Sequence, residues 1–305
     1  MYSLKLFIRA IRAPFFSASA LSVFSATALS YYSRSLFHPV RFFLILFTVL
    51  CFHAAANVLN DYEDSRSGCD DMNRDYIHPF TGGSRLVQEK ILGLLDLKKL
   101  AVTLFLLGMV SGLILTILTH WSIALFFPPA FIGGYFYTRF FSKIGWGELI
   151  IFLNFGLLTT LSSFYIQCLS VTSAAFLLSA INGLLVVNIL LMNEFPDAEA
   201  DRKAGKMTMV ARWGAKRAAG CYLLISLGSY ILILSGVIMR IFPLMSLMAL
   251  APIPMGFFAF QSIRKGDRDS QKKAILLTIL NHLLTTGLVT ASFLVANVPK
   301  FQYLY

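Results

Sequence analysis

Apolar runs long enough to cross a membrane recur along the whole chain, and they constrain its fold more than any other feature. A helix that spans the hydrocarbon core needs about 20 predominantly apolar residues. The segments that meet this requirement are 14–33, 39–60, 99–119, 121–140, 148–168, 173–195, 217–239, 242–262 and 274–297. Lipid-exposed backbone must satisfy its own hydrogen bonds, and segments of this length do so as helices. The sequence therefore predicts an all-α polytopic membrane protein with nine transmembrane helices in one domain, residues 1–305.

The composition excludes several other classes of protein. Hydrophobic residues make up 57% of the chain and charged residues only 13%, which leaves no room for a large soluble domain. The four cysteines show no CxxC pairing, so neither a disulfide framework nor a zinc site is expected. The net charge of +11 favours contact with anionic membrane lipids. It does not indicate nucleic-acid binding, because no soluble basic module carries it.

Charged residues assign an orientation to these spans. With the N-terminus in the cytoplasm, all basic residues except Arg34, Arg41, Arg240 and Lys300 fall in cytoplasmic segments, as the positive-inside rule requires. All 15 acidic residues fall on the same side, although acids contribute little to topology. The cytoplasmic loops at about 61–98 and 197–216 therefore become the main candidates for a functional site.

Two acidic segments close the second and sixth predicted spans. They are NDYEDSRSGCDD (60–71) and NEFPDAEADRKAGK (193–206). Residues four apart share one helix face, so each segment presents amide and carboxylate oxygens together. One acidic helix end is usually a solvated cap, but the duplicated Asn-x-x-x-Asp pattern favours Mg²⁺, which prefers such hard ligands. The predicted metal ligands are Asn60, Asp61, Asp64, Asp70, Asn193, Asp197 and Asp201, and two facing clusters suit two ions.

Basic side chains accompany both acidic segments and would contact the phosphate groups of a ligand that the metals bridge. These candidates are Arg12, Arg66, Arg85, Lys206 and Arg212. Other phosphate and metal motifs do not fit. The spacing after Asp64 fails the EF-hand pattern, and Gly82-Gly83-Ser84 lacks the Gly-Lys-Ser/Thr of a P-loop.

At these residues the chain resembles the UbiA superfamily of intramembrane prenyltransferases, whose two aspartate-rich motifs end the second and sixth of nine helices. NDYED (60–64) and DAEAD (197–201) match these motifs. The resemblance implies Mg²⁺-dependent transfer of a prenyl group from a polyprenyl diphosphate to an acceptor. It assigns the catalytic role to Asn60, Asp64, Asp197 and Asp201.

The first acidic motif departs from the usual family pattern at one position, and this indicates a subfamily. The usual last aspartate of the first motif would fall at Gly68, and Asp70 follows instead. That spacing is similar to MenA-type members, which prenylate 1,4-dihydroxy-2-naphthoate in menaquinone biosynthesis. FTGGSR (80–85), GWGELIIFLNFG (145–156) and DRKAGKMTMVARWG (201–214) also look MenA-like. This implies an aromatic acceptor and a bacterial or archaeal inner-membrane enzyme with its active site facing the cytoplasm. Acceptors such as 4-hydroxybenzoate, a glyceryl phosphate lipid or a tetrapyrrole remain alternatives.

Polar and aromatic residues inside the spans are candidates for the substrate and acceptor pocket. They are His53, Asn57, Tyr135, Tyr137, Glu148, Asn154 and Asn188. The tyrosine rings would shield a developing allylic cation. Interhelical hydrogen bonding is the alternative for His53, Asn154 and Asn188, and Glu148 could instead complement a helix dipole. Intramembrane polar residues would also suit an ion-coupled transporter, but transporter sites lie near the bilayer midplane, whereas these acids cluster at one face.

Overall fold

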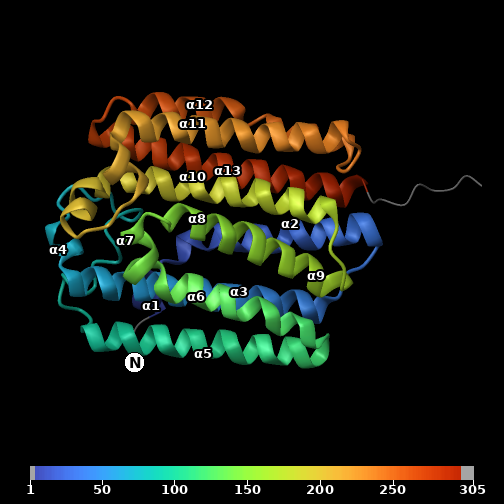
Figure 1. The fold of residues 1–305 in the computed structure, drawn as a ribbon, viewed down its shortest axis with the longest axis horizontal. Coiled ribbons are helices and arrows are strands. Elements are labelled where there is room, and N and C mark those ends of the chain that lie inside the picture. The colour runs from blue at the N-terminus through green and yellow to red at the C-terminus, as the bar shows by residue number, and fades with distance from the viewer. Residues whose placement is uncertain (1–3, 297–305) are drawn as a thin grey trace, which may run out of the picture.

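The computed structural model describes residues 4–296, which form a bundle of helices running side by side along one long axis (Figure 1). No strand occurs within these residues, as the sequence predicts. Lys300 and the last residue of the predicted 274–297 span lie outside the described range. The α-helices are α1 Leu4–Ala10, α2 Phe16–Arg34, α3 Pro39–Ser67, α4 Cys69–Met72, α5 Leu94–Leu118, α6 Phe127–Phe136, α7 Ser142–Ile144, α8 Gly147–Ile151, α9 Ser162–Cys168, α10 Ser173–Lys203, α11 Met209–Ile238, α12 Ile253–Ile263 and α13 Arg268–Ala296.

Shorter 3₁₀ and π segments connect several of these helices. The 3₁₀ segments are η1 Ala13–Phe15, η2 Trp121–Phe126 and η5 Leu244–Leu250, and the π segments are η3 Tyr137–Phe141 and η4 Phe152–Leu161. Because η4 continues directly from α8 into α9, residues 147–168 act as one long helix. π segments inside helices often mark functional sites.

Eight helices within residues 4–296 are long and apolar enough to cross a membrane. The predicted span at 121–140 is not among these eight helices. Its residues are nevertheless helical without a break, because η2, α6 and η3 follow one another directly and lead into α7. Pro128 and Pro129 occupy the first turn of α6, the part of a helix that is compatible with proline.

Both acidic segments continue the helices that precede them. α3 runs past the predicted end of its span to Ser67 and stops at Gly68, whose left-handed φ of 75° is typical of a helix C-terminus. α10 runs to Lys203 and passes through Pro196 without ending. The two helices finish at the same end of the bundle, where α4, α7 and their loops gather at the left of Figure 1.

Apolar packing fixes the long loop between α4 and α5 against this end. Ile77 is buried with Leu191, Met192 and Phe195 of α10, while Leu86 is buried in a second cluster with Val58 of α3. The loop is thus anchored to both motif-bearing helices, which places its backbone beside their acidic side chains.

Candidate active site

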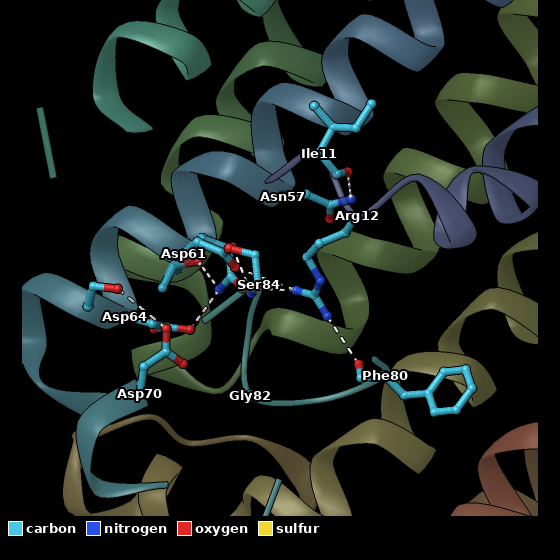
Figure 2. A network of polar contacts seen from close by, with 12 residues as sticks. Ile11, Arg12, Asn57, Asp61, Asp64, Asp70, Phe80, Gly82 and Ser84 are labelled. Carbon is cyan, nitrogen blue, oxygen red and sulfur yellow. Dashed lines mark hydrogen bonds and ion pairs between the residues drawn. The ribbon is translucent and has the colours of Figure 1, made fainter. Parts of the chain in front are cut away.

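Hydrogen bonds to neighbouring groups hold the side chains of the first acidic segment in place. Asn60 donates its amide hydrogens to Asp64 Oδ2 at 3.0 Å and to Thr138 Oγ1 at 2.8 Å. Asp61 is 2% exposed and accepts a hydrogen bond from the Ser84 backbone N–H at 2.9 Å. Asn60 and Asp64 share a helix face, as the i, i+4 spacing predicts, and Asp61 and Asp64 lie close together on the same helix (Figure 2).

Two glycines let the loop backbone approach the carboxylates closely. Gly82 and Gly83 both adopt left-handed φ angles, 75° and 71°, which side chains other than glycine adopt at a cost. A Cβ on Gly83 would lie 3.0 Å from carboxylate oxygens of both Asp61 and Asp70. The Gly82 N–H is directed at Asp197 Oδ2, at 3.3 Å. The FTGGSR sequence thus supplies backbone N–H groups to both acidic segments.

The second acidic segment is held by groups from three different parts of the chain. Asp197 Oδ1 accepts a hydrogen bond of 2.7 Å from the amide of Asn73, in addition to the Gly82 N–H. Asp201 accepts one from Thr208 Oγ1 at 3.3 Å, and the Cys69 thiol lies 3.8 Å from its other oxygen. Burial raises the pKa of the Cys69 thiol above its ordinary range, so this cysteine is a neutral donor.

Lys206 joins the two acidic segments directly. Its ammonium nitrogen lies 2.7 Å from Asp64 on α3 and 3.4 Å from Asp201 on α10. Burial by itself would lower the pKa of Lys206, but these two carboxylates outweigh it and raise that pKa well above its ordinary value. A buried cation therefore neutralises the point at which the two segments meet.

Asp70 lies close to Asp61 and Asp64. These three residues, together with Asp197 and Asp201, are called the acidic cluster below. Burial, together with the negative charges of Asp64 and Asp61, raises the pKa of the Asp70 carboxyl to about 8. Its backbone carbonyl accepts a hydrogen bond from the Arg85 guanidinium, which also lies over the Tyr76 ring at 4.5 Å. The carboxyl group displaced from the usual motif position is thus close to the other acids of the first segment.

The chemistry of these donors fits a hard divalent cation, although their present spacing is set by other partners. Within residues 4–296, no group of three or more His, Cys, Asp or Glu side chains is arranged to hold a metal ion. However, Asp61 Oδ1 and Asn193 Oδ1 are buried without a hydrogen-bond partner, and buried polar atoms are normally satisfied. Carboxylate and amide oxygens suit Mg²⁺, and the Lys206 ammonium stands between two of these carboxylates.

The predicted phosphate-binding cations separate into two groups. Arg12 reaches down to the first segment, with its guanidinium 3.4 Å from Asn60 Oδ1, 3.9 Å from Asp61 and 3.1 Å from the Phe80 carbonyl (Figure 2). Together with Lys206 and Arg85 it contacts the acidic cluster. Arg66 instead pairs with Glu63 at 2.9 Å. Arg212 is exposed and lies over the Trp213 ring, so neither of these two arginines pairs with an aspartate of the acidic segments.

A cavity of about 230 Å³ extends from the acidic cluster into the bundle. Its wall is mainly apolar, with aromatic rings such as Phe15, Phe52 and Phe155. Several predicted residues line it: Arg12, His53, Asn57, Asn60, Tyr137, Asn154 and Asn193. Arg12, Asn60 and Asn193 thus belong both to the acidic end and to the cavity, and this end of the cavity is called its mouth below. Deep apolar pockets with a few polar groups are typical ligand sites.

Three predicted pocket residues do not line this cavity. Tyr135 stacks on Phe131, with ring centroids 5.3 Å apart, because two residues along a helix turn it away from Tyr137. Asn188 is 1% exposed, and neither of its amide atoms has a hydrogen-bond partner. Glu148 accepts a 2.5 Å hydrogen bond from the Met209 N–H, so it caps the start of α11 instead of facing a ligand.

Sequence reasoning missed residues whose partners come from distant loops. Glu194 accepts a hydrogen bond from the Val210 N–H at 3.3 Å and, with Glu148, anchors the first turn of α11. Asn73 and Thr208 orient Asp197 and Asp201. A polar residue in a polar loop carries no spacing signal, but Glu194 stands beside Asn193 and its charge within an apolar helix could have identified it.

Comparisons with known proteins identify the family of the chain. A model described as the UbiA prenyltransferase family matches residues 21–284. The 1,4-dihydroxy-2-naphthoate octaprenyltransferase of Escherichia coli (strain K12) is 30% identical over 203 residues, which are 63% of this chain and 64% of that protein. The match thus covers slightly less than two thirds of that relative's length. The 2-carboxy-1,4-naphthoquinone phytyltransferase of Synechocystis sp. (strain ATCC 27184 / PCC 6803 / Kazusa) is 26% identical over 268 residues, 85% of this chain and 82% of that protein.

A solved structure shares the fold. The UbiA homolog from Archaeoglobus fulgidus bound to DMAPP and Mg²⁺ superimposes on this chain with a TM-score of 0.59. The match covers 95% of this chain and 97% of that one, at 14% sequence identity.

Proposed function

The chain belongs to the UbiA prenyltransferase family, and from this premise we propose that it transfers a prenyl group from a polyprenyl diphosphate to an aromatic acceptor with the aid of Mg²⁺. We propose 1,4-dihydroxy-2-naphthoate as the acceptor, which would place the enzyme in menaquinone biosynthesis. The E. coli relative is named for that acceptor. The position of Asp70, two residues after Gly68 as in MenA-type members, supports the same choice.

One observation carries this proposal. Two acidic segments, more than a hundred residues apart in the sequence, meet through Lys206 at the mouth of an apolar cavity. A diphosphate at the mouth would face the acids and their cations, while the attached isoprenoid would extend into the apolar wall. A molecule with a charged head and a long hydrocarbon tail matches this division of polarity.

The metal would be held by the oxygen ligands of both segments. Those are Asn60, Asp61, Asp64, Asp70, Asn193, Asp197 and Asp201, with the catalytic role assigned to Asn60, Asp64, Asp197 and Asp201. When bound, Mg²⁺ supplies positive charge that stabilises the diphosphate leaving group. The UbiA homolog from Archaeoglobus fulgidus is described as bound to DMAPP and Mg²⁺, which supports the same use here, and the two facing segments suit two ions.

The chain's own groups would perform the remaining tasks. Arg12 and Lys206 would bind diphosphate oxygens as negative charge grows on them, with Arg85 beside them. The apolar wall excludes water, so the allylic cation reaches the acceptor before it is hydrolysed. Tyr137 lines the mouth, where an aromatic face stabilises a nearby cation. Asn57 and Asn154 line the same cavity and would contact the acceptor.

The protein is an integral multi-pass membrane protein, given its family and the eight long apolar helices found between residues 4 and 296. We propose that residues 1–305 act as a single domain in a bacterial or archaeal inner membrane, with the acidic end facing the cytoplasm. The distribution of basic residues supports that orientation.

The proposal is tested by incubating purified protein with Mg²⁺, a radiolabelled polyprenyl diphosphate and a panel of acceptors. We expect Mg²⁺-dependent labelling of 1,4-dihydroxy-2-naphthoate, and loss of at least 100-fold in Asp197→Asn. A matched control is Asp267→Asn, an exposed acid near the start of α13 outside the site. Labelling of 4-hydroxybenzoate alone would correct the acceptor. Absence of both labelling and diphosphate release would refute the enzyme and return attention to a transporter.

A further inference from the structure

His53 occupies a specific environment inside the cavity. It lies on α3, and its ring forms part of the cavity wall. The rings of Phe16 and Phe155 flank it, with centroids 5.3 Å and 4.9 Å away. These contacts hold the imidazole in one orientation and separate it from bulk water.

The hydrogen bonds around His53 are compatible with a proton on Nδ1. Nδ1 lies 2.9 Å from Ser19 Oγ, and which of the two atoms donates depends on the tautomer of the ring. Ser19 Oγ also lies 3.2 Å from the Phe16 carbonyl. When the single Ser19 hydroxyl hydrogen is directed to that carbonyl, Nδ1 donates to Ser19 Oγ and Nε2 keeps a free lone pair, which is the tautomer that a base at Nε2 requires.

Nε2 is available to a bound molecule. It makes no hydrogen bond to any residue of the described chain, and it is not among the buried polar atoms that lack a partner. The ring lines the cavity, and Nε2 is its nitrogen that no residue of the described chain occupies. By contrast, both ring nitrogens of His282 are buried without a hydrogen-bond partner, as expected for a histidine in the core that no ligand can reach.

The depth of His53 suits the second substrate. It precedes Asn60 by seven residues, which corresponds to about 10 Å along the helix axis. The reacting carbon of a prenyl diphosphate is bonded directly to the diphosphate and would lie just inside the mouth. An aromatic acceptor placed beneath that carbon would bring a ring hydroxyl to the level of His53.

We propose that Nε2 of His53 is the general base that takes the hydroxyl proton of the aromatic acceptor. This inference rests on the proposed prenyl transfer. As the O–H proton moves to Nε2, the oxygen forms a carbonyl and a ring electron pair forms the bond to the prenyl carbon. The bond between that carbon and diphosphate breaks, and the diphosphate departs with its electron pair.

The ring then regains its aromatic state. The alkylated carbon loses the substituent it carried and leaves the bonding electrons in the ring; that substituent is either a proton, which the released diphosphate takes up, or a carboxylate, which leaves as CO₂. The carbonyl oxygen takes back a proton from Nε2, so the histidine returns to its starting state. Asn57 and Asn154 line the same cavity but have no basic atom, so His53 is the base that the wall offers to an acceptor.

The test compares the wild-type protein with His53→Asn, whose amide can still donate to Ser19. Acceptors are 1,4-dihydroxy-2-naphthoate and a series of substituted naphthols with increasingly acidic hydroxyl groups. Positioned acid–base groups contribute about 10²- to 10⁴-fold to rate. We therefore expect kcat for the first acceptor to fall at least 100-fold, while the Kd for farnesyl diphosphate with Mg²⁺ changes less than threefold.

The acceptor series separates catalysis from packing. A more acidic hydroxyl needs less help from a base, so the His53→Asn defect should shrink at least tenfold across the series. Ser19→Ala keeps the ring and removes its orienting partner, and it should show a smaller defect with the same trend. An equal defect with every acceptor, or a kcat within threefold of wild type, overturns the inference. A wild-type protein that labels no acceptor overturns the proposed function and this inference with it.

Discussion

Removing Lys206 is the most informative single perturbation of the acidic cluster. Its ammonium nitrogen lies 2.7 Å from Asp64 and 3.4 Å from Asp201, and all three side chains are nearly buried. Lys206→Met preserves the aliphatic volume and leaves the two carboxylates without their shared cation. Removing one partner of a buried ion pair costs about 3–5 kcal/mol. In EDTA the variant should therefore unfold roughly 6–20 °C below the wild-type protein.

The same substitution should strengthen metal binding. In the wild-type protein a divalent cation has to displace the ammonium, and each charge-assisted hydrogen bond lost in that exchange is worth about 1.5–3 kcal/mol. Lys206→Met avoids that loss, so the Kd for Mn²⁺ without diphosphate should fall roughly 10- to 100-fold. With prenyl diphosphate present, kcat/KM should fall, because the diphosphate loses a cationic partner.

Mn²⁺ binding is measured by electron paramagnetic resonance, and thermal unfolding is followed in the same detergent. Lys203→Met is the matched control, since Lys203 pairs with Glu199 and both side chains are more than half exposed. Surface pairs contribute about 0–1 kcal/mol, so this control should match the wild-type protein in both assays. Weaker Mn²⁺ binding by Lys206→Met, or unchanged unfolding in EDTA, would refute the role assigned to Lys206.

Three further predictions follow from the same contacts. Gly83→Ala should abolish activity, because its Cβ would lie 3.0 Å from carboxylate oxygens, whereas Gly205→Ala has the same left-handed φ and open space and should lose about 1–2 kcal/mol of stability with activity retained. The pKa of Asp70 is raised from 3.8 to about 8 in the folded chain, so between these pH values the folded state holds a proton that the unfolded state releases. The stability of the metal-free protein should therefore fall from about pH 4 to about pH 8, and this pH dependence should be flatter in Asp70→Asn. Glu148→Ala should lose about 1–3 kcal/mol by leaving the Met209 N–H unpaired, whereas Glu148→Gln keeps an acceptor oxygen; a raised KM for the acceptor in Glu148→Gln would instead place Glu148 in the substrate pocket.

The helical parts of the site could be predicted because local periodicity determines them. Asn60 and Asp64 lie four residues apart on a helix that extends through both, and their side chains are hydrogen-bonded as that spacing requires. The apolar segments indicate an all-α bundle for the same reason. The 121–140 segment is the exception: it is helical throughout but combines 3₁₀, α and π turns, which a hydropathy window does not reveal.

The contacts between elements could not be predicted, because they depend on how loops cross the bundle. Lys206 is one of several cations in its segment, and its position between Asp64 and Asp201 follows from the tertiary arrangement of α3 and α10. Arg66 and Arg212 looked equally suitable in the sequence, but side chains that start on another face of a helix pair elsewhere. Glu148 lies in the first turn of its own helix α8, as the sequence predicts, but the hydrogen bond by which its carboxylate also caps α11 could not be predicted.

The acidic cluster also explains how so many carboxylates can stand at the end of apolar helices. Unpaired charges there would be strongly unfavourable, yet the backbone N–H groups of Gly82 and Ser84 each compensate one carboxylate, and the Lys206 ammonium compensates two. These partners belong to the chain, so the metal-free fold does not depend on a bound ion. Chelation should therefore stop the reaction while leaving the helical circular dichroism spectrum unchanged. This separates the cluster from structural metal sites, in which binding energy is folding energy, and it assigns the metal to substrate binding and not to assembly of the bundle.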